Sequence, residues 1–191
     1  MSAIITKYLG NLKGIEIGRG AHRDYALNAI NVDAAFHELF APEQLKYVST
    51  PAKVDIVAES SAIPLADSTQ DFVFSSHVLE HVPDPIATLI EWYRLVHNGG
   101  YVAMIVPNRS AAELDRGRPV TTLSELIVAH NMNGFKIKNP IGHVTVWDPF
   151  ILSSLIEFGQ QINLWNFCIR CLQFPDDHTG DGILLVLEAT K

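Results

Sequence analysis

The sequence has few cysteines, few basic residues and no long apolar run. Its 191 residues include two cysteines and 14 lysines and arginines against 21 aspartates and glutamates, for a net charge of −7. Two cysteines cannot build a disulfide framework. The acidic excess, without a local basic patch, provides no positive field to neutralise a phosphate backbone, so we expect no nucleic-acid partner.

The apolar runs are too short for a membrane span or an export signal. The longest uninterrupted aliphatic run, 183–187, is far below the roughly 20 residues that a membrane helix needs. The start MSAIITKYLG has no apolar core followed by a cleavage site. With 48% hydrophobic and only 18% charged residues, the chain does not have the composition of a disordered protein. We therefore expect a cytoplasmic protein without membrane contact.

Short apolar segments alternate with helical patterns in the first half of the chain. Strands are expected over 13–18, 29–33, 54–59, 71–76 and 101–106. The clearest helix lies between the last two of these strands. Asp84 is a suitable N-cap, Pro85 suits the first helical position, and Asn98-Gly99-Gly100 is expected to end the helix. Strand, helix and strand with short connections predict a parallel crossover.

The second half predicts two more helices and a terminal hairpin. Thr122 and Glu125 have the spacing of a capping box, and another helix is expected to begin at Asp148-Pro149 and end at Gly159. The last two β-rich runs, 166–174 and 182–190, are separated only by PDDHTGD. This connection is too short for a crossover helix, so the last strand should be antiparallel to its neighbour. At this length, a single domain over 1–191 is expected.

Candidate ligand-binding residues follow the expected strands. In open α/β sheets, ligands bind beyond the carboxyl ends of the strands. Glu16-Ile17-Gly18-Arg19-Gly20 ends the first strand, Asp33 the second and Glu59-Ser60 the third. The two glycines would let a ligand approach the backbone, but Arg23 replaces the third glycine of a dinucleotide fingerprint. The pattern therefore favours a nucleoside without phosphates, with its ribose hydroxyls on Asp33.

The segment 58–108, AESSAIPLADSTQDFVFSSHVLEHVPDPIATLIEWYRLVHNGGYVAMIVPN, resembles the core of the class I S-adenosylmethionine-dependent methyltransferases, type 11. The matching elements are Glu59 with Ile63-Pro64, Asp71-Phe72, His77-Val78-Leu79-Glu80-His81, Arg94-Leu95, Gly99-Gly100 and Pro107. With the glycine motif and Asp33, the resemblance covers roughly residues 13–108. It implies the α/β fold of that family, a Rossmann-like methyltransferase sheet that is mostly parallel with an antiparallel last strand and helices on both faces. It also implies S-adenosyl-L-methionine as the cofactor.

A narrower resemblance extends to a methyltransferase subgroup in which a short Gly-Ala-His turn, here Gly20-Ala21-His22, replaces the usual first helix. It continues through the Asp-Arg-x-Arg-Pro-x-Thr segment 115–121 and through 143–147. The subgroup is associated with glycan or natural-product gene neighbourhoods. The resemblance thus implies a small-molecule or saccharide acceptor, methylated on oxygen, with 109–147 as an insertion on the acceptor side.

The resemblance also implies roles for individual residues. Those implied to bind the cofactor are Glu16, Gly18, Arg19 and Gly20 for its methionine part, Asp33 for the ribose, Glu59 and Ser60 for the adenine edge, and Ser76 and His77 near the sulfonium. Glu59 stands where the family usually has Asp, so the adenine contact could shift to the backbone of Ser60.

A catalytic base is needed only if the acceptor must lose a proton, because the cofactor brings the activated methyl group. The candidate bases are His77, His81, Asp115 and His143. We predict that His143 or His77 assists this step, although loop histidines are more often packing residues. Arg116 and Arg118 could clamp an anionic group or simply form a solvated turn. No metal site is expected, since Cys168 and Cys171 would point to opposite faces of a strand.

Two other functions stay open. One is a non-catalytic accessory protein that retains the methyltransferase fold, and the other, less favoured, is a nicotinamide oxidoreductase. The first expected strand begins near residue 13, so we expect no helix ahead of it to cover the cofactor. The site should then be more open than usual and be closed by 109–147, by a large acceptor or by the second subunit of a homodimer.

Overall fold

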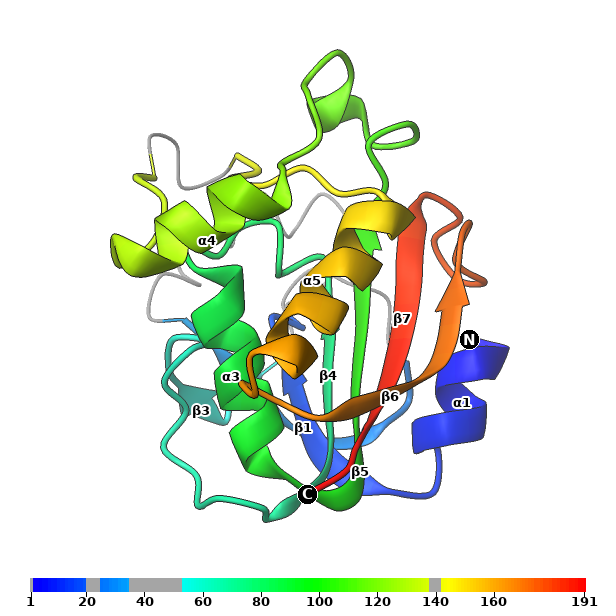
Figure 1. Ribbon diagram of the computed structural model, residues 1–191. Coiled ribbons are helices and arrows are strands. Elements are labelled where there is room, and N and C mark those ends of the chain that lie inside the picture. Colours follow the sequence, from blue (N-terminus) through cyan, green and yellow to red (C-terminus); the bar gives the residue numbers. More distant parts are fainter. Residues whose placement is uncertain (1, 20–24, 35–52, 138–141) are drawn as a thin grey trace.

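The computed structural model describes residues 2–19, 25–34, 53–137 and 142–191, and these form one seven-stranded sheet (Figure 1). The strands are β1 Lys13–Ile17, β2 Asn28–Asp33, β3 Ile56–Val57, β4 Gln70–Ser76, β5 Val96–Pro107, β6 Phe167–Gln173 and β7 Gly182–Ala189. Their order is β3-β2-β1-β4-β5-β7-β6. The first five strands are parallel to one another, whereas β7 is antiparallel to both β5 and β6. This confirms the expected mostly parallel sheet with an antiparallel last strand.

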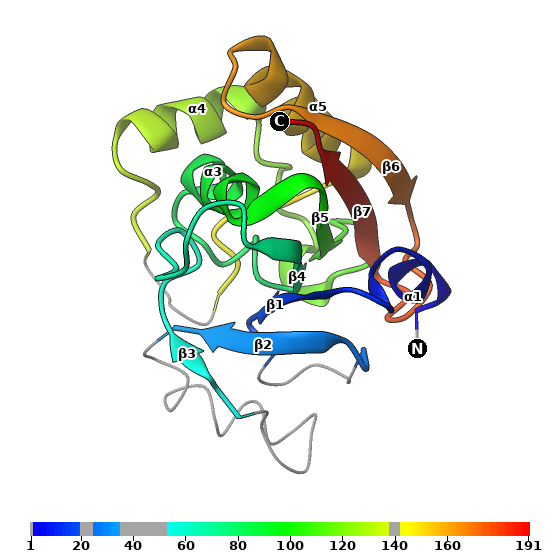
Figure 2. The same cartoon turned by 90° about the horizontal axis from the view of Figure 1, so that it is seen from below.

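Helices cover both faces of the sheet (Figure 2). The helices are α1 Ala3–Leu9, α3 Pro85–Leu95, α4 Leu123–Asn131 and α5 Pro149–Gln161, with a 3-10 turn at Glu113–Asp115. On one face, Trp92 of α3 and Leu155 of α5 pack in the same core as Val73 and Met104 of the sheet. On the other face, α1 packs against Phe74 of β4. No helix in the described part of the chain is long and apolar enough to cross a membrane.

The expectation of no helix ahead of the first strand is wrong. The hydroxyl of Ser2 caps α1 by accepting the N–H of Ile5 at 3.0 Å, and the helix buries Ile5 and Leu9. Asp177, in the β6–β7 connection, anchors its first turn by accepting the N–H of Ile4 at 3.0 Å. With only seven residues, the helix offers too short an apolar repeat to stand out in the sequence.

The boundary between α3 and β5 also differs from the prediction. The helix ends at Leu95 and the strand begins at Val96, so Asn98-Gly99-Gly100 lies inside β5. Pairing with β4 changes register there, from Gln70 opposite Val96 to Phe72 opposite Tyr101. The extra β5 residues form a bulge in which Gly99 has a φ of +80°. The glycine pair that suggested a helix stop is thus required by the irregular strand.

The predicted starts of the three later helices are confirmed. The carboxylate of Asp84 accepts the N–H of Ala87 at 2.9 Å, and that of Asp148 accepts the N–H of Ile151 at 2.8 Å. Thr122 caps α4 through the predicted capping box. Helix α5 continues two residues beyond the predicted end at Gly159.

The segment after β5 departs from the sheet and returns to it at one place. Asn108 forms a parallel bridge with Trp147, and the N–H of Arg109 donates to the carbonyl of Trp147 at 2.9 Å. Between these ends lies α4, which contacts both α3 and α5. The predicted insertion 109–147 is therefore tied to the sheet at the carboxyl end of β5.

Candidate functional site

The turn after β1 has no room for a side chain. Gly18 has a φ of +70°, and its N–H donates to the carbonyl of Val32 at 2.9 Å. A Cβ on Gly18 would collide with the side chain of Val78, which follows β4. Glycine is thus needed both for the backbone conformation and for this close approach. The predicted cofactor residue Gly20, together with 21–23, lies outside the described residues.

Glu16 is a buried carboxylate close to this turn. It is 1% exposed, and its Oε2 lies 3.7 Å from Nε of Arg19. Arg19 is itself only partly exposed, so this acidic and basic pair lies at the end of β1 with little contact with solvent. These two predicted cofactor residues therefore lie together.

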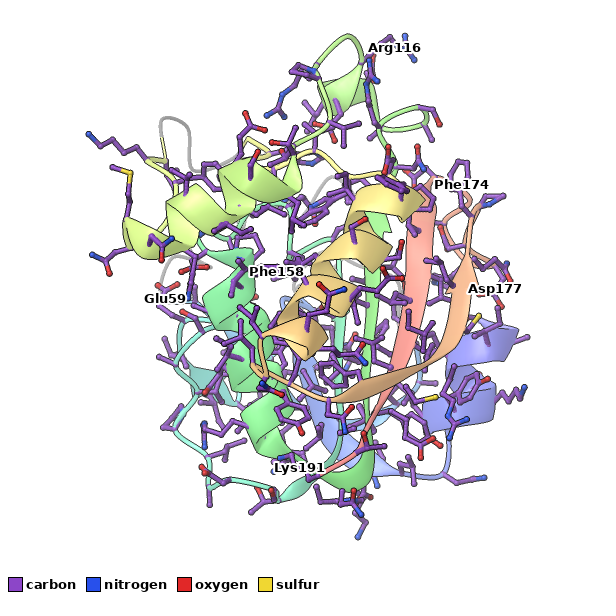
Figure 3. All side chains as sticks on the ribbon, in the orientation of Figure 1. Glu59, Arg116, Phe158, Phe174, Asp177 and Lys191 are labelled. Atoms are coloured by element: carbon purple, nitrogen blue, oxygen red, sulfur yellow. The ribbon has the colours of Figure 1, made fainter. Side chains whose placement is uncertain are left out.

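Asp33 and the Glu59-Ser60 pair follow the two neighbouring strands. Asp33 is half-buried at the end of β2, and its carboxylate accepts the N–H of Ala34 at 2.8 Å. The carbonyl of Ser60 accepts the indole N–H of Trp92 at 3.0 Å, which ties this loop to α3. Glu59 is exposed and lies beside α3 at the edge of the molecule (Figure 3).

Ser76 is the last residue of β4, which pairs with β1, and His77 follows it. Ser76 is buried, and its hydroxyl lies 3.0 Å from the hydroxyl of Tyr25. The sequence interpretation did not single out Tyr25, whose pKa is raised by burial. His77 has a φ of +55°, and its N–H donates to the carbonyl of Ile105 at 2.8 Å. Backbone strain of this kind in a non-glycine residue is concentrated at functional sites.

Beyond His77 lies a group that we name the Glu80 cluster: His77, Glu80, His81, Asp115 and His143. The carboxylate of Glu80 is completely buried, with Oε1 at 3.6 Å from Nδ1 of His77 and 3.7 Å from Nε2 of His81. Burial alone raises the pKa of Glu80, but the two imidazoles hold it below its ordinary value. For His77, burial lowers the pKa, and the carboxylates of Glu80, Asp181 and Asp176 together outweigh this effect, so its pKa lies above the usual value.

His143 is oriented by a carboxylate. Its Nδ1 lies 2.8 Å from Oδ2 of Asp115, and both side chains are buried. The other oxygen of Asp115 accepts a hydrogen bond from Arg118 at 2.7 Å. Arg118 is thus used to hold Asp115, while Arg116 is exposed at the tip of the segment after β5 (Figure 3).

Backbone hydrogen bonds explain why residues far apart in the chain meet in this cluster. The carbonyl of Glu80 accepts the N–H groups of Val144 at 2.7 Å and Thr145 at 3.1 Å. The ring of His143 consequently lies across that of His81, with centroids 5.0 Å apart and an interplanar angle of 82°. The structure brings together the four candidate bases His77, His81, Asp115 and His143. Glu80 had no predicted role, and the motif that contains it was the available signal.

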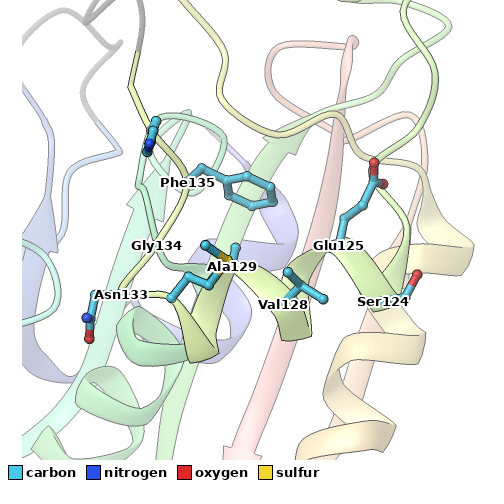
Figure 4. Close-up of a pocket in the computed structure, with 9 residues that line it drawn as sticks. Ser124, Glu125, Val128, Ala129, Asn133, Gly134 and Phe135 are labelled. Atoms are coloured by element: carbon cyan, nitrogen blue, oxygen red, sulfur yellow. The ribbon is translucent and has the colours of Figure 1, made fainter.

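A separate apolar hollow runs along α4 and the residues that follow it (Figure 4). Val128 and Phe135 are among the residues that line it. None of the predicted cofactor or catalytic residues lines this hollow. It is therefore distinct from the edge where the parallel strands end.

Comparison with known proteins agrees with this geometry. The family model described as a methyltransferase domain matches residues 14–104. No curated protein matches the chain by sequence.

Among solved structures, an S-adenosylmethionine-dependent methyltransferase from Thermotoga maritima has a TM-score of 0.57 and 17% identity, covering 98% of this chain and 86% of that chain. One from Methanosarcina mazei has a TM-score of 0.55 and 17% identity, covering 100% and 98%. A chain from the Haloferax volcanii complex of a methyltransferase with the Trm112 methyltransferase activator has a TM-score of 0.57 and 14% identity, covering 94% and 83%. The chain thus matches the methyltransferase-domain model over residues 14–104. It has the Rossmann-like fold of the S-adenosylmethionine-dependent methyltransferases.

Proposed function

We propose that the protein is an S-adenosylmethionine-dependent methyltransferase whose single domain, 1–191, methylates an oxygen of a small-molecule or saccharide acceptor. The observation that carries the proposal is the common edge of the sheet. There, Glu16, Asp33, Glu59 and Ser76 lie at or just beyond the carboxyl ends of four neighbouring strands, β1, β2, β3 and β4. This is where ligands bind in open α/β sheets.

The residues at this edge suit a nucleoside-containing cofactor. Gly18 makes the tight turn after β1, where a Cβ would collide with Val78, and the half-buried carboxylate of Asp33 can accept two hydroxyl hydrogen bonds. In the proposal, Glu16 with the backbone of 18–20 holds the methionine part and Asp33 the ribose. Glu59 and Ser60 hold the adenine, while Ser76 and His77 form the wall near the methyl group.

When bound, the cofactor supplies the activated methyl group, and this chain orients the acceptor and excludes water. Orientation of the reacting groups alone can contribute roughly 7–11 kcal/mol at the upper end. The segment 109–147 would contribute the acceptor side, because it begins at the carboxyl end of β5 and delivers His143 to the Glu80 cluster. An acceptor hydroxyl that loses its proton would find His143 or His77 there.

Calorimetry with S-adenosylmethionine tests the proposal. We expect one molecule bound per chain with micromolar affinity and no binding of NAD under the same conditions. Absence of S-adenosylmethionine binding at millimolar concentration would contradict the proposal. It would favour the alternative of a non-catalytic accessory protein, for which the exposure of Glu59 is the specific observation.

Replacing the two predicted bases tests the proton transfer. We expect His143→Ala or His77→Ala to lower turnover about 100-fold, within the range for loss of general base catalysis. Turnover is measured as release of S-adenosylhomocysteine with an acceptor identified from a panel of hydroxylated compounds and sugars. Cofactor affinity is measured separately by calorimetry.

His97→Ala is the matched control, because His97 also pairs with a carboxylate, Asp71 at 3.2 Å, but lies outside both the cluster and 109–147. Full activity is expected for this variant. Unchanged turnover in both His143→Ala and His77→Ala would remove the base from the proposal and leave methyl transfer itself intact.

A further inference from the structure

The buried carboxylate of Glu80 lacks a hydrogen-bond donor. Among the described residues, neither of its side-chain oxygens has a hydrogen-bond partner, although the residue is 0% exposed. The imidazole nitrogens of His77 and His81 lie at ion-pair distance, 3.6 and 3.7 Å from Oε1. A buried carboxylate without hydrogen bonds is costly unless a cation balances it. The site thus has the charge and the vacant acceptor atoms that a cation would use.

In two histidines beside Glu80, the ring nitrogen Nδ1 already has an oxygen partner. Nδ1 of His81 lies 3.2 Å from the carbonyl of Gly142, and Nδ1 of His143 lies 2.8 Å from the carboxylate of Asp115. Both oxygens accept, so each Nδ1 carries a proton, and in the neutral form of each ring the lone pair lies on Nε2. Metal-binding histidines have this arrangement, in which a carbonyl or carboxylate fixes the ring from behind.

The donor atoms are close enough to share one ion. One carboxylate oxygen of Glu80 and one nitrogen each of His81 and His143 all lie within 4.8 Å of one another. Donors about 2.1 Å from a tetrahedral zinc ion are roughly 3.4 Å apart, and Oε1 of Glu80 is already 3.7 Å from Nε2 of His81. Small side-chain rotations would bring the donor atoms to the spacing required around one ion.

We propose that Glu80, His81 and His143 bind a divalent first-row transition metal ion, with zinc as the first candidate. Two imidazoles and a carboxylate form a borderline donor set that suits such ions better than calcium or magnesium. Three protein ligands leave a coordination position open, as in catalytic zinc sites. The side chain of His81 is 36% exposed, which gives the ion a route from solvent. The sequence predicted no metal site from the placement of Cys168 and Cys171 alone. The three ligands proposed here come together only in the folded chain.

The proposal limits the role of His143. As a metal ligand through Nε2, His143 would not be available to take a proton from the acceptor. An oxygen atom of the acceptor could occupy the open coordination position, where the ion would lower the pKa of its hydroxyl. Metal binding itself requires neither S-adenosylmethionine nor turnover.

The test is metal titration of the untagged, EDTA-treated protein. We expect one zinc ion per chain by calorimetry and elemental analysis, and visible absorption bands on addition of cobalt. Glu80→Gln, His81→Ala and His143→Ala should each weaken zinc binding at least about 10-fold, and Asp115→Asn, which alters the support of His143, about 10–100-fold. His97→Ala is the matched control with unchanged binding, since His97 pairs with Asp71 at 3.2 Å outside the cluster.

Binding of less than one zinc ion per chain, or binding that survives both Glu80→Gln and His81→Ala, would overturn the metal site. Circular dichroism checks that the variants are folded. If they are not, the cobalt spectrum of the wild-type protein decides, because nitrogen ligation must appear in its band positions and zinc must abolish the bands. All measurements are made without cofactor, so a failure here is separate from a failure of S-adenosylmethionine binding.

Discussion

Asp33→Ala is expected to weaken S-adenosylmethionine binding at least about 100-fold in calorimetry. In the proposed complex, the charged carboxylate of Asp33 accepts two ribose hydroxyls, and hydrogen bonds to charged groups contribute about 1.5–3 kcal/mol each. A loss of about 3 kcal/mol corresponds to roughly a 100-fold change in affinity. Asp33 is the last residue of β2 and is only half-buried, so the fold should survive the substitution.

Asp67→Ala is the control for Asp33. Asp67 is 75% exposed and pairs with Arg94 in the loop before β4, remote from the edge where the cofactor would bind. Its removal should leave the affinity unchanged. An affinity of Asp33→Ala within threefold of the wild-type value would show that Asp33 does not hold the ribose.

Gly14→Ala is expected to lower the free energy of unfolding by at least about 3 kcal/mol, the upper range for forcing extra atoms into a packed core. Gly14 lies opposite Phe72 where β1 pairs with β4. An added Cβ would overlap the carbonyl oxygen of Phe72 and lie 2.7 Å from Cγ of its ring. Because the obstacle includes the backbone of a central strand, a side-chain rotation cannot relieve it. Urea unfolding followed by circular dichroism measures the effect.

Gly117→Ala is the control for Gly14→Ala, because it adds backbone strain without a steric clash. Gly117 has a φ of +80°, and nothing lies within 4 Å of an added Cβ. Its substitution should cost only about 1–2 kcal/mol, the penalty of the left-handed conformation. If Gly14→Ala costs no more than Gly117→Ala, then β1 and β4 are not packed as closely as described.

Most of the sheet could be predicted from the sequence because its signals are local. Apolar runs mark the strands, and Asp84, Thr122 and Asp148 mark helix starts through side-chain caps. The start of β5 could not be predicted, because Gly99-Gly100 is compatible with a helix end and with a strand bulge. Pairing with β4, a tertiary interaction, decides between them.

The candidate site also has one part that local sequence signals predict and one part that depends on tertiary contacts. The placement of Glu16, Asp33 and Ser76 on one edge could be predicted, because residues that end neighbouring parallel strands must lie on one edge of the sheet. The Glu80 cluster could not, because it depends on Val144 and Thr145 docking onto the carbonyl of Glu80. No local pattern encodes a contact between residues more than 60 positions apart.

The bridge between Asn108 and Trp147 has an evolutionary consequence. The segment between them leaves the sheet and returns to it at one point, while α4 within it contacts α3 and α5. Its exposed turns can therefore change in length and sequence without shifting β5, and under the proposed function related chains could vary them to suit different acceptors. The constrained parts would be α4 and residues 143–145, which complete the Glu80 cluster.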